Sequence, residues 1–487
     1  MATTTPVSSP EPLEAGGAAL GETATPGETP TPGEMPTSLP PGPRAPAIVQ
    51  TLAWAVAPTW LMDRCAERLG ESFTLTFAPS GMKLVLLSDP EAVKTVFTAP
   101  AEVAPSAAHS SPVAPVMGPS SVIVLTGPEH LRQRKLLLPP FHGERMREYE
   151  DVIVAATRRD MAGWPMERPM RLQERTRAIT LDVILRAVFG VEGERMQALK
   201  EAIAGLLKPV HPLAIVLFSL RRPLLERPTG AIGRALDRLD AVVYEELARR
   251  RSQDLGGRND ILSLLMQARD EDGLPMTDSE LRDELVTLLL AGHETTATSV
   301  AWAIERLVRH PDKLSRLVAE IDALPDGGGE EYMTAVINET LRVRPVVPIV
   351  ARMLQQELQV GEHRLAKGTR VVPSIYLTNR NPRSYERPTE FSPERFLQSA
   401  PETFSWIPFG GGIRRCIGAS FALLEMKLML RTMLSELEPS LPPGDRWRNG
   451  EWNRRRAITL VPAGGARVLW RRHAPPGSPS ARSASAG

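Results

Sequence analysis

Cysteine is scarce in this chain, which has only Cys65 and Cys416 among its 487 residues. Two thiols cannot build a disulfide framework, a four-cysteine zinc site or a cysteine-ligated iron–sulfur cluster. Such low cysteine usage is typical of a reducing compartment, so we expect a cytoplasmic protein. An excess of one charge is also lacking, because 58 basic side chains face 57 acidic ones. The net charge of +1 gives no indication of nucleic-acid binding.

A long hydrophobic run is missing as well. A membrane-spanning helix needs about 18 or more consecutive apolar residues. The nearest approach, residues 46–60, is interrupted by Gln50 and Pro58. We therefore expect no transmembrane segment.

Both ends of the chain lack the apolar residues of a folded segment. Residues 1–46 contain 11 of the 46 prolines, no aromatic residue and one basic residue, Arg44. Such a segment cannot offset its ordering entropy by burial, and it lacks the charge pattern of a signal or transit peptide. We predict disordered tails at 1–46 and 472–487. With 42% hydrophobic residues to form a core, one large domain is expected over 47–471.

Helical hydrophobic patterns dominate this predicted domain. A capping-box pattern at Thr277 and Glu280 begins a long helix that extends to about Arg309. Other helical patterns cover 60–69, 90–98, 128–138, 144–161, 172–188, 194–207 and 234–251. A hairpin is expected over 73–77 and 83–87, and short strands over 351–360, 369–373 and 457–468. The fold class is therefore α+β, mostly helical, without βαβ alternation.

The most informative stretch is 409–418, where three glycines and two arginines precede Cys416 and Gly418 follows it. A lone cysteine is more often a small buried hydrophobe than a ligand. Here, however, the glycines allow the backbone to pass close to a large flat group. The start of an apolar helix and the neighbouring arginines favour a thiolate. A single axial thiolate bond to haem iron fits this pattern.

This stretch resembles the haem-binding loop of cytochromes P450, FxxGxRxCxG. Its fixed positions are occupied by Phe409, Gly412, Arg414, Cys416 and Gly418. The resemblance extends over about residues 45–471. It implies the P450 fold, with small β-sheets beside a helical haem-binding core. It also implies haem b as the cofactor, with iron bound to the Cys416 thiolate.

Glu339 and Arg342 match the ExxR pattern of the same family. The spacing alone has no weight, because it recurs elsewhere in the chain, for example at Glu144–Arg147, Glu174–Arg177 and Glu246–Arg249. Its position upstream of residues 393–396, which resemble the family's PERF segment, selects this pair. Residues i and i+3 share a helix face, so Glu339 and Arg342 can pair, and Arg395 joins them from the later loop. The resemblance implies a buried triad that holds the cysteine loop in position.

A polar stretch, residues 291–296, interrupts the apolar middle of the long helix. His293 and Glu294 begin like the zinc motif HExxH, but no histidine occupies the fifth position. The stretch resembles instead the P450 oxygen-activation motif. That resemblance implies that Gly292 leaves room for dioxygen, Thr295 offers a hydroxyl to the distal oxygen, and Glu294 connects to a proton source. A mid-helix threonine more often bonds back to the preceding turn.

Four cations match the positions that bind the haem propionates in the family. His130 and Arg134 resemble its HxxxR pattern at the start of a helix, and Arg352 and Arg414 fill its other two positions. Many family members have histidine where this chain has Arg414. For each of these cations alone, a solvated surface position is the ordinary alternative.

The resemblance implies a monooxygenase of bacterial type that inserts one oxygen atom of O2 into its substrate. Protons would arrive through Thr295 and Glu294. Because no flavin, nicotinamide or cluster motif is present, electrons must come from an external ferredoxin or flavodoxin with its reductase. A basic docking face could consist of Arg132, Lys135, Arg415, Lys427 and Arg431. Ordinary surface charge is the alternative for each.

Two apolar stretches are candidate walls of a substrate pocket: the loop 99–127 and residues 209–220. They favour an apolar substrate such as a fatty acid or a terpenoid-like molecule, although both could simply pack the core. Two other functions remain open, a gas-binding haem protein without turnover and an isomerase or peroxide-using hydroxylase. The Glu294–Thr295 pair argues against both, because sequential protonation of bound oxygen is what requires it.

Overall fold

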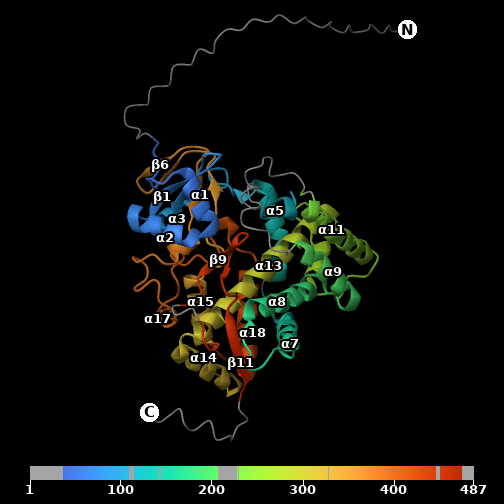
Figure 1. Ribbon diagram of the computed structural model, residues 1–487. Coiled ribbons are helices and arrows are strands. Elements are labelled where there is room, and N and C mark those ends of the chain that lie inside the picture. The colour runs from blue at the N-terminus through green and yellow to red at the C-terminus, as the bar shows by residue number, and fades with distance from the viewer. Residues whose placement is uncertain are drawn as a thin grey trace, which may run out of the picture. The chain divides into compact units, whose positions relative to one another are not determined.

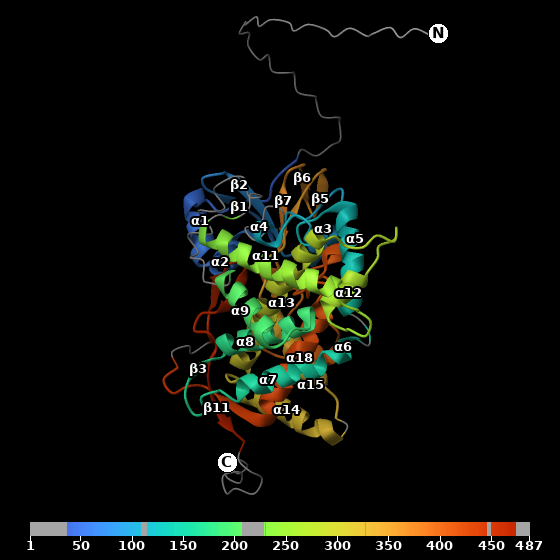
Figure 2. The ribbon, with the colours of Figure 1, turned by 90° about the vertical axis from the view of Figure 1, so that its right-hand side faces the viewer.

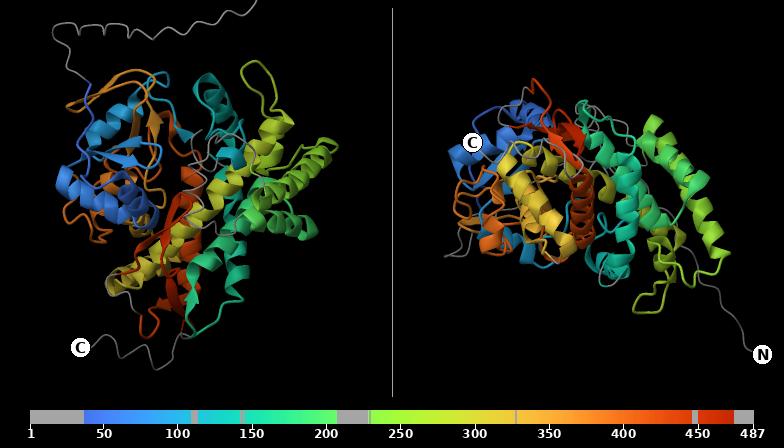
Figure 3. Two further views of the ribbon diagram at one scale, coloured as in Figure 1. Left: turned by 45° about the horizontal axis from the view of Figure 1, so that its top comes forward. Right: turned by 90° about the horizontal axis from the view of Figure 1, so that it is seen from below.

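Helices make up most of the molecule (Figures 1, 2 and 3). The computed structural model describes residues 37–108, 114–141, 143, 145–206, 228, 230–326, 328–445 and 450–473. The candidate pocket wall at 209–220 lies outside the described residues. The helices are α1 (Ala47–Val56), α2 (Pro58–Leu69), α3 (Pro90–Thr98), α4 (Ala114–Met117), α5 (Gly127–Leu137), α6 (Arg145–Glu148), α7 (Glu150–Met161), α8 (Leu172–Phe189), α9 (Gly193–Leu206), α11 (Gly230–Arg251), α12 (Ile261–Gln267), α13 (Asp278–Leu307), α14 (Pro311–Ala323), α15 (Glu331–Val343), α16 (Ile375–Thr378), α17 (Arg395–Gln398) and α18 (Ala419–Glu436).

Among the described residues, four small sheets accompany the helices. The largest has the strand order β1-β2-β7-β4, with β2 and β7 parallel and the other pairs antiparallel. Its strands are β1 (Ser72–Phe77), β2 (Met82–Leu87), β7 (Arg370–Pro373) and β4 (Arg352–Met353). The others join β3 (Met170–Arg171), β11 (Arg467–Arg472) and β8 (Leu437–Ser440), then β9 (Asn453–Arg456) with β10 (Thr459–Pro462), and β5 (Leu358–Val360) with β6 (His363–Leu365). Figure 1 shows how the blue N-terminal elements lie beside orange segments from late in the sequence.

The long helix α13 passes through the interior, beside α8 and α18 (Figure 1). Thr277 caps it as predicted, since its hydroxyl accepts from the Glu280 N–H and the Glu280 carboxylate accepts from the Thr277 N–H. This reciprocal pairing satisfies two of the donors that a helix start leaves free. The predicted helices and the hairpin 73–87 are confirmed with small shifts at their ends. The pattern at 144–161 is divided into α6 and α7, and the acidic pair Glu150 and Asp151 favours the new start.

The chain is ordered earlier than the composition predicts. The composition predicts that residues 37–46 belong to the tail, and this part of the prediction is wrong, because the structure places them along β1 and before α1. The Thr74 N–H donates to the Pro41 carbonyl at 2.9 Å, and the buried Thr74 hydroxyl donates to the Pro40 carbonyl at 2.7 Å. Proline carbonyls remain good acceptors although proline has no N–H. A proline-rich segment can therefore pack on a strand without any apolar face of its own.

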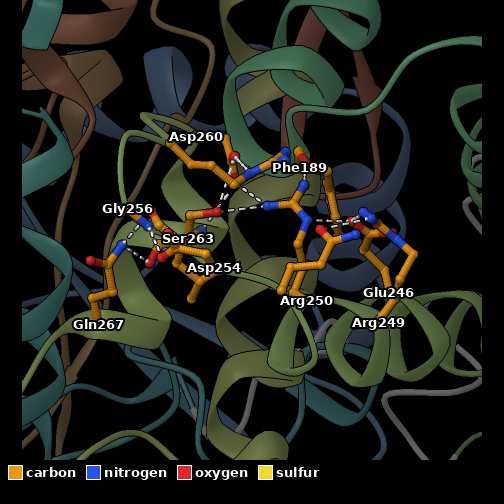
Figure 4. Close-up of polar contacts among 12 residues, drawn as sticks. Phe189, Glu246, Arg249, Arg250, Asp254, Gly256, Asp260, Ser263 and Gln267 are labelled. Atoms are coloured by element: carbon orange, nitrogen blue, oxygen red, sulfur yellow. Dashed lines mark hydrogen bonds and ion pairs between the residues drawn. The ribbon is translucent and has the colours of Figure 1, made fainter.

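A buried arginine, Arg250, connects the helices α8, α11 and α12. Arg250 of α11 is fully buried, and its guanidinium binds the carboxylates of Glu246 at 2.7 Å and Asp260 at 2.7 Å. It also donates to the Ser263 hydroxyl and to the Phe189 carbonyl at the end of α8. Figure 4 shows these contacts converging on the guanidinium. Every charge in this Arg250 cluster has an opposite charge beside it, as a buried ion pair requires.

Candidate active site

The Cys416 loop is shaped by glycines in left-handed conformations. Gly410 has φ 70° and Gly412 has φ 65°, values that other residues rarely adopt. The loop closes where the Cys416 N–H donates to the Phe409 carbonyl at 3.0 Å. Helix α18 begins directly afterwards, at Ala419, and the Gly418 N–H donates to the thiol. The cysteine therefore lies at a helix N-terminus, as its sequence context predicts.

The glycines also serve a packing purpose that the sequence did not indicate. A methyl group added at Gly411 would lie 2.4 Å from the Phe97 ring, and one added at Gly412 would lie 2.1 Å from the Phe97 carbonyl oxygen. Both distances are far below van der Waals contact. The loop thus needs glycine in order to pack against α3, in addition to any group it passes.

Solvent reaches the Cys416 side chain, whereas Cys65 is buried in the core beside β1. Cys416 nevertheless has protein atoms on most sides, and this crowding raises the pKa of its thiol. The Gly418 N–H, Arg134 and Arg415 act in the opposite direction and lower it. A bond to a metal cation would deprotonate the thiol outright.

The Glu339–Arg342–Arg395 triad is confirmed. Arg342 binds Glu339 through two hydrogen bonds, at 2.7 and 2.8 Å, and both side chains are fully buried. Arg395 reaches the same carboxylate at 3.1 Å. Arg342 also donates to the carbonyls of Asn379, Pro388 and Glu390. The triad therefore fixes the backbone of the segment that leads to the Cys416 loop.

One short stretch of α13 is open to solvent although the helix is otherwise buried. From Leu281 to Leu307 the only residues that are not buried are Leu288, Leu290, Ala291, Gly292, Glu294 and Thr295. Leu288, Ala291, Gly292 and Thr295 follow the i, i+3, i+4, i+7 spacing, so they share one helix face. This open face coincides with the predicted oxygen-activation stretch.

Thr295 and Glu294 have different partners in the ligand-free chain. The Thr295 hydroxyl donates to the Ala291 carbonyl at 2.6 Å, which is the local contact expected of a mid-helix threonine. Glu294 lies 2.8 Å from the Arg177 Nε of α8 and 3.7 Å from Arg456 of β9. A methyl group added at Gly292 would approach Ile184 of α8 to 3.0 Å, so this glycine also lets α13 and α8 pack closely.

The four predicted propionate ligands come together. The pKa of His130 is lowered to about 4, by burial first and then by Arg414, Arg134 and Arg352. Burial lowers the pKa of Arg352 and of Arg414 to about 10 each. Arg352 also lies over the Phe97 ring. We call His130, Arg134, Arg352 and Arg414 the cation cluster.

No carboxylate in the described part of the chain forms an ion pair with the cation cluster. Arg414 donates instead to the carbonyls of Val122, Ile123 and Leu125, and the buried Nδ1 of His130 has no hydrogen-bond partner among the described residues. Grouped cations that are buried, as Arg352 is, or half-buried, as Arg134 and Arg414 are, are costly unless an anion compensates them. A ligand with two carboxylates, such as haem with its propionates, fits this donor set.

The loop before α5 connects the open helix to the cation cluster. The Val122 N–H donates to the Glu284 carboxylate of α13 at 2.7 Å, and the Val122 carbonyl accepts from Arg414 at 2.9 Å. The Ser121 and Thr287 hydroxyls bond to each other at 2.7 Å. Burial raises the pKa of Glu284 to about 8, so its side chain is mostly protonated at neutral pH.

Glu425 is a buried acid that the sequence analysis missed. It lies on α18, nine residues after Cys416, and accepts a hydrogen bond from Thr296, the neighbour of Thr295. Its other oxygen has no partner among the described residues, and burial raises its pKa to about 8. A single acid in the apolar run of α18 was the available signal.

The five predicted docking cations are mostly engaged by nearby acids. Arg132 binds Asp270 and Glu280 at 2.6 Å each, and Lys135 binds Glu271. Glu330 holds both Lys427 and Arg431, at 3.3 and 3.4 Å. Among the described residues, Arg415 is exposed and forms no carboxylate ion pair. The face is therefore less basic than the sequence suggests.

Taken together, an exposed cysteine at a helix N-terminus, a buried ExxR triad and a cation cluster without a carboxylate partner among the described residues are the features of a haem-thiolate protein. The cytochrome P450 family model matches residues 40–465. Cytochrome P450 137 of Mycobacterium tuberculosis is 42% identical over 442 residues, which cover 89% of this chain and 91% of that protein. Cytochrome P450 135B1 of Mycobacterium bovis is 39% identical, covering 88% and 91%. The chain belongs to the cytochrome P450 family.

Solved structures agree with this assignment. A cyanobacterial CYP120A1 with retinoic acid bound has a TM-score of 0.76 and 25% identity, covering 90% of this chain and all of that one. The haem domain of cytochrome P450DA superimposes with a TM-score of 0.78 at 23% identity, which shows the shared fold. The protein is therefore an oxidoreductase, a monooxygenase whose cofactor is haem with a cysteine thiolate on iron. No helix in the described residues is long and apolar enough to cross a membrane.

Proposed function

We propose that Cys416 supplies the axial thiolate and that the protein inserts one oxygen atom of O2 into an apolar small molecule. The open face of α13 supports this proposal most directly. It presents Leu288, Ala291 and Gly292 beside a single polar group, the Thr295 hydroxyl. When bound, the haem supplies the oxygen chemistry, and the thiolate donates electron density that favours O–O cleavage.

Thr295 on the open face and Glu294, its neighbour in the sequence, have distinct proposed roles. Thr295 would hold a proton at its Oγ1, because its hydrogen bond to the Ala291 carbonyl leaves the oxygen lone pairs free to accept another. Glu294 would pass protons inward after releasing Arg177 or Arg456. Gly292 keeps this part of the helix surface free of a side chain.

The cation cluster would bind the propionates. His130 would donate from Nδ1, while Arg134 and Arg352 would supply charge. Arg414 would act partly by holding the loop at 122–125 in place, because its guanidinium already binds carbonyls there. Phe409, Gly412 and Gly418 would shape the loop around the iron ligand.

The substrate class proposed is a fatty acid or a terpenoid-like molecule. The apolar residues of the open face support this class, because they offer no charged partner to a polar substrate. The similarity to CYP120A1 adds support, since retinoic acid in that structure is an apolar isoprenoid acid.

An external ferredoxin or flavodoxin, with its reductase, is the proposed electron donor. Arg415, exposed beside the iron ligand, would contact the acidic partner first. Arg132 and Lys135 would have to exchange their present carboxylate partners for those of the donor. Two free cysteines support a reducing, cytoplasmic setting.

Spectroscopic titration followed by turnover tests this proposal. Fatty acids and isoprenoid acids should shift the ferric haem spectrum with saturation, whereas a polar sugar control should not. Steady-state product should then require O2, NADPH and a surrogate ferredoxin with its reductase. Product from peroxide alone at an equal rate would favour the peroxide-using alternative. Saturable O2 binding without any product would favour a gas-binding protein.

A further inference from the structure

Helix α1 is oriented with its apolar face outward. Its buried side chains include Gln50 and Thr51, whereas Ile48, Val49, Leu52 and Val56 are exposed. Leu52 exposes 53% of its surface and Val56 exposes 77%. At 100° per residue these four side chains occupy one continuous stripe. A helix on the surface of a globular protein ordinarily buries its apolar face and exposes its polar face to water.

Polar contacts fix this orientation. The Gln50 amide donates to the Ala45 carbonyl at 2.8 Å, and its oxygen accepts from the Thr76 N–H at 2.8 Å. The Thr51 hydroxyl accepts from the Ala78 N–H at 2.9 Å. Turning the helix over would break all three contacts and leave buried donors without partners. The outward apolar stripe is therefore part of the folded structure.

The apolar surface continues beyond α1. Trp60, just past the junction with α2, exposes 60% of its surface. The β9–β10 hairpin contacts α1, and Arg455 of β9 donates to the Trp54 carbonyl at 3.3 Å. Trp452, at one end of this hairpin, exposes 66% of its surface. Figure 2 shows α1 at the outer edge of the body.

We call Ile48, Val49, Leu52, Val56 and Trp60 the α1 patch. These side chains expose on the order of 500 Å² of apolar surface, comparable with the largest patch on a typical monomer, which is often functional. Scattered exposed hydrophobic residues are ordinary, but four in one helical stripe, followed by an exposed tryptophan on the next helix, are not.

Basic residues flank the α1 patch. The first acids after it, Asp63 and Glu67 of α2, each face a basic partner, since Glu67 pairs with Arg64 at 3.3 Å and Asp63 interacts with Arg380. Between Thr37 and Met62 the only ionisable side chain is Arg44, which is exposed. The hairpin 452–462 carries three arginines and no acid, and among them Arg454 is exposed. Exposed tryptophans and arginines beside an apolar helix face are the features of a helix that lies in a lipid headgroup region.

We propose that the α1 patch binds the surface of an anionic lipid bilayer, with α1 lying parallel to the membrane plane. At ten residues α1 is too short to span a bilayer, so this binding is peripheral. The apolar stripe would enter the headgroup–acyl boundary, and Arg44 and Arg454 would contact lipid phosphates. A protein partner would instead need an apolar groove with an acidic rim, and sedimentation velocity tests a second copy of the chain as that partner.

Vesicle flotation of the full-length, haem-loaded protein tests the proposal. We expect the wild type to float with phosphatidylcholine vesicles containing phosphatidylglycerol, and at least tenfold less with pure phosphatidylcholine at low salt. Leu52→Glu combined with Val56→Glu should reduce flotation at least tenfold. Leu274→Glu is the matched control, because Leu274 exposes 57% of its surface outside the patch, and it should float like the wild type.

The ferrous carbon-monoxide spectrum of each variant shows whether the fold and haem site are intact. Equal flotation of the wild type and the double variant would overturn the proposal. So would a wild-type dimer in sedimentation velocity that the double variant dissociates while vesicle binding is absent, because the patch would then be an interface between copies. Arg44→Glu alone should lower flotation at least twofold relative to the wild type, which would support contact with anionic headgroups.

Discussion

Two groups of buried basic residues in this protein differ in what they face. In the Arg250 cluster the Arg250 guanidinium binds two carboxylates of the same chain, Glu246 and Asp260, at 2.7 Å each (Figure 4). Arg342 is paired in the same way with Glu339. The cation cluster has no such carboxylate among the described residues. Burial instead lowers the pKa of Arg352 and of Arg414 to about 10.

This difference separates structural arginines from binding arginines. A buried arginine whose carboxylate is built into the chain completes the fold, and removing it leaves an acid uncompensated. A buried cation without such a partner makes the unliganded chain less stable, and an external anion relieves that cost. Burial alone would not distinguish the two groups, because Arg250, Arg342, His130 and Arg352 are all buried. The partner identifies the role.

The largest effect is expected at Cys416, the proposed ligand of the haem iron. Cys416→Ser should abolish the red-shifted carbon-monoxide band of the ferrous protein and all turnover, because a hydroxyl does not replace the thiolate. Cys65→Ser should retain both, since Cys65 packs in the core without a polar partner. Difference spectra of the purified variants measure this. Loss of the band in Cys65→Ser alone would reassign the ligand.

Thr295→Ala should separate binding from turnover. Product per reductant consumed should fall by on the order of 10²-fold, the contribution of a positioned proton donor. Hydrogen peroxide should rise correspondingly, while substrate titration of the ferric spectrum should barely change. Thr295→Ser retains the hydroxyl and should keep most of the coupling. An unchanged product-to-reductant ratio in Thr295→Ala would exclude the proton role.

Arg250→Met and Arg352→Met should act in opposite ways on the haem-free protein. Arg250→Met removes the fully buried partner of Glu246 and Asp260 and leaves them only the more exposed Arg249 and Arg258, so it should cost about 3 kcal/mol of unfolding free energy. Arg352→Met removes a buried cation without a built-in partner and should leave the stability of the haem-free chain equal or higher. Haem retention should instead fall in Arg352→Met. Urea unfolding and haem transfer to apomyoglobin measure the two effects; equal destabilisation would contradict the comparison.

Much of the fold could be predicted because its elements have local signals. The capping box at Thr277, the turn between β1 and β2 and the start of α3 at Pro90 are each specified within a few residues. The order of strands in the sheet β1-β2-β7-β4 could not be derived in this way. It joins residues almost 300 positions apart, and local patterns contain no information on such pairs.

The residues of the candidate site likewise fall into those that local motifs predict and those that only the fold brings together. Cys416, Thr295 and the Glu339–Arg342 pair lie in short motifs, so their positions could be predicted. The partners of Glu294 could not, because Arg177 and Arg456 come from distant elements. Glu425 escaped notice because a single acid in an apolar helix usually points to solvent, and only the fold shows that this one is buried.

A buried acid with a raised pKa, unlike the paired carboxylates of the Arg250 cluster, should destabilise the fold as pH rises. The pKa of Glu284 is raised from its ordinary value near 4.5 to about 8 by burial. Between these two values the folded protein holds a proton here that the unfolded chain releases, so the contribution of Glu284 to stability should fall as pH rises from 4.5 to 8. Glu425 acts in the same sense, whereas the lowered pKa values of His130 and His293 act in the opposite sense. The total decrease should be at most a few kcal/mol. Glu284→Gln should flatten this decrease in urea unfolding at several pH values, and an unchanged slope would contradict the assignment.

The smallest effect is expected near the N-terminus, where a truncation that keeps residues 37–46 can be compared with one that removes them. Deleting residues 2–36 should change neither stability nor haem content, because a proline-rich segment without aromatic residues has little apolar surface to bury. Deleting 2–46 removes the carbonyls that pair the buried Thr74 hydroxyl and the Gln50 amide, and should cost about 1–3 kcal/mol. Thermal unfolding of both truncations measures the difference. Equal stability would show that residues 37–46 only rest on β1, whereas a loss already present in the shorter deletion would show that the first 36 residues contribute to the fold.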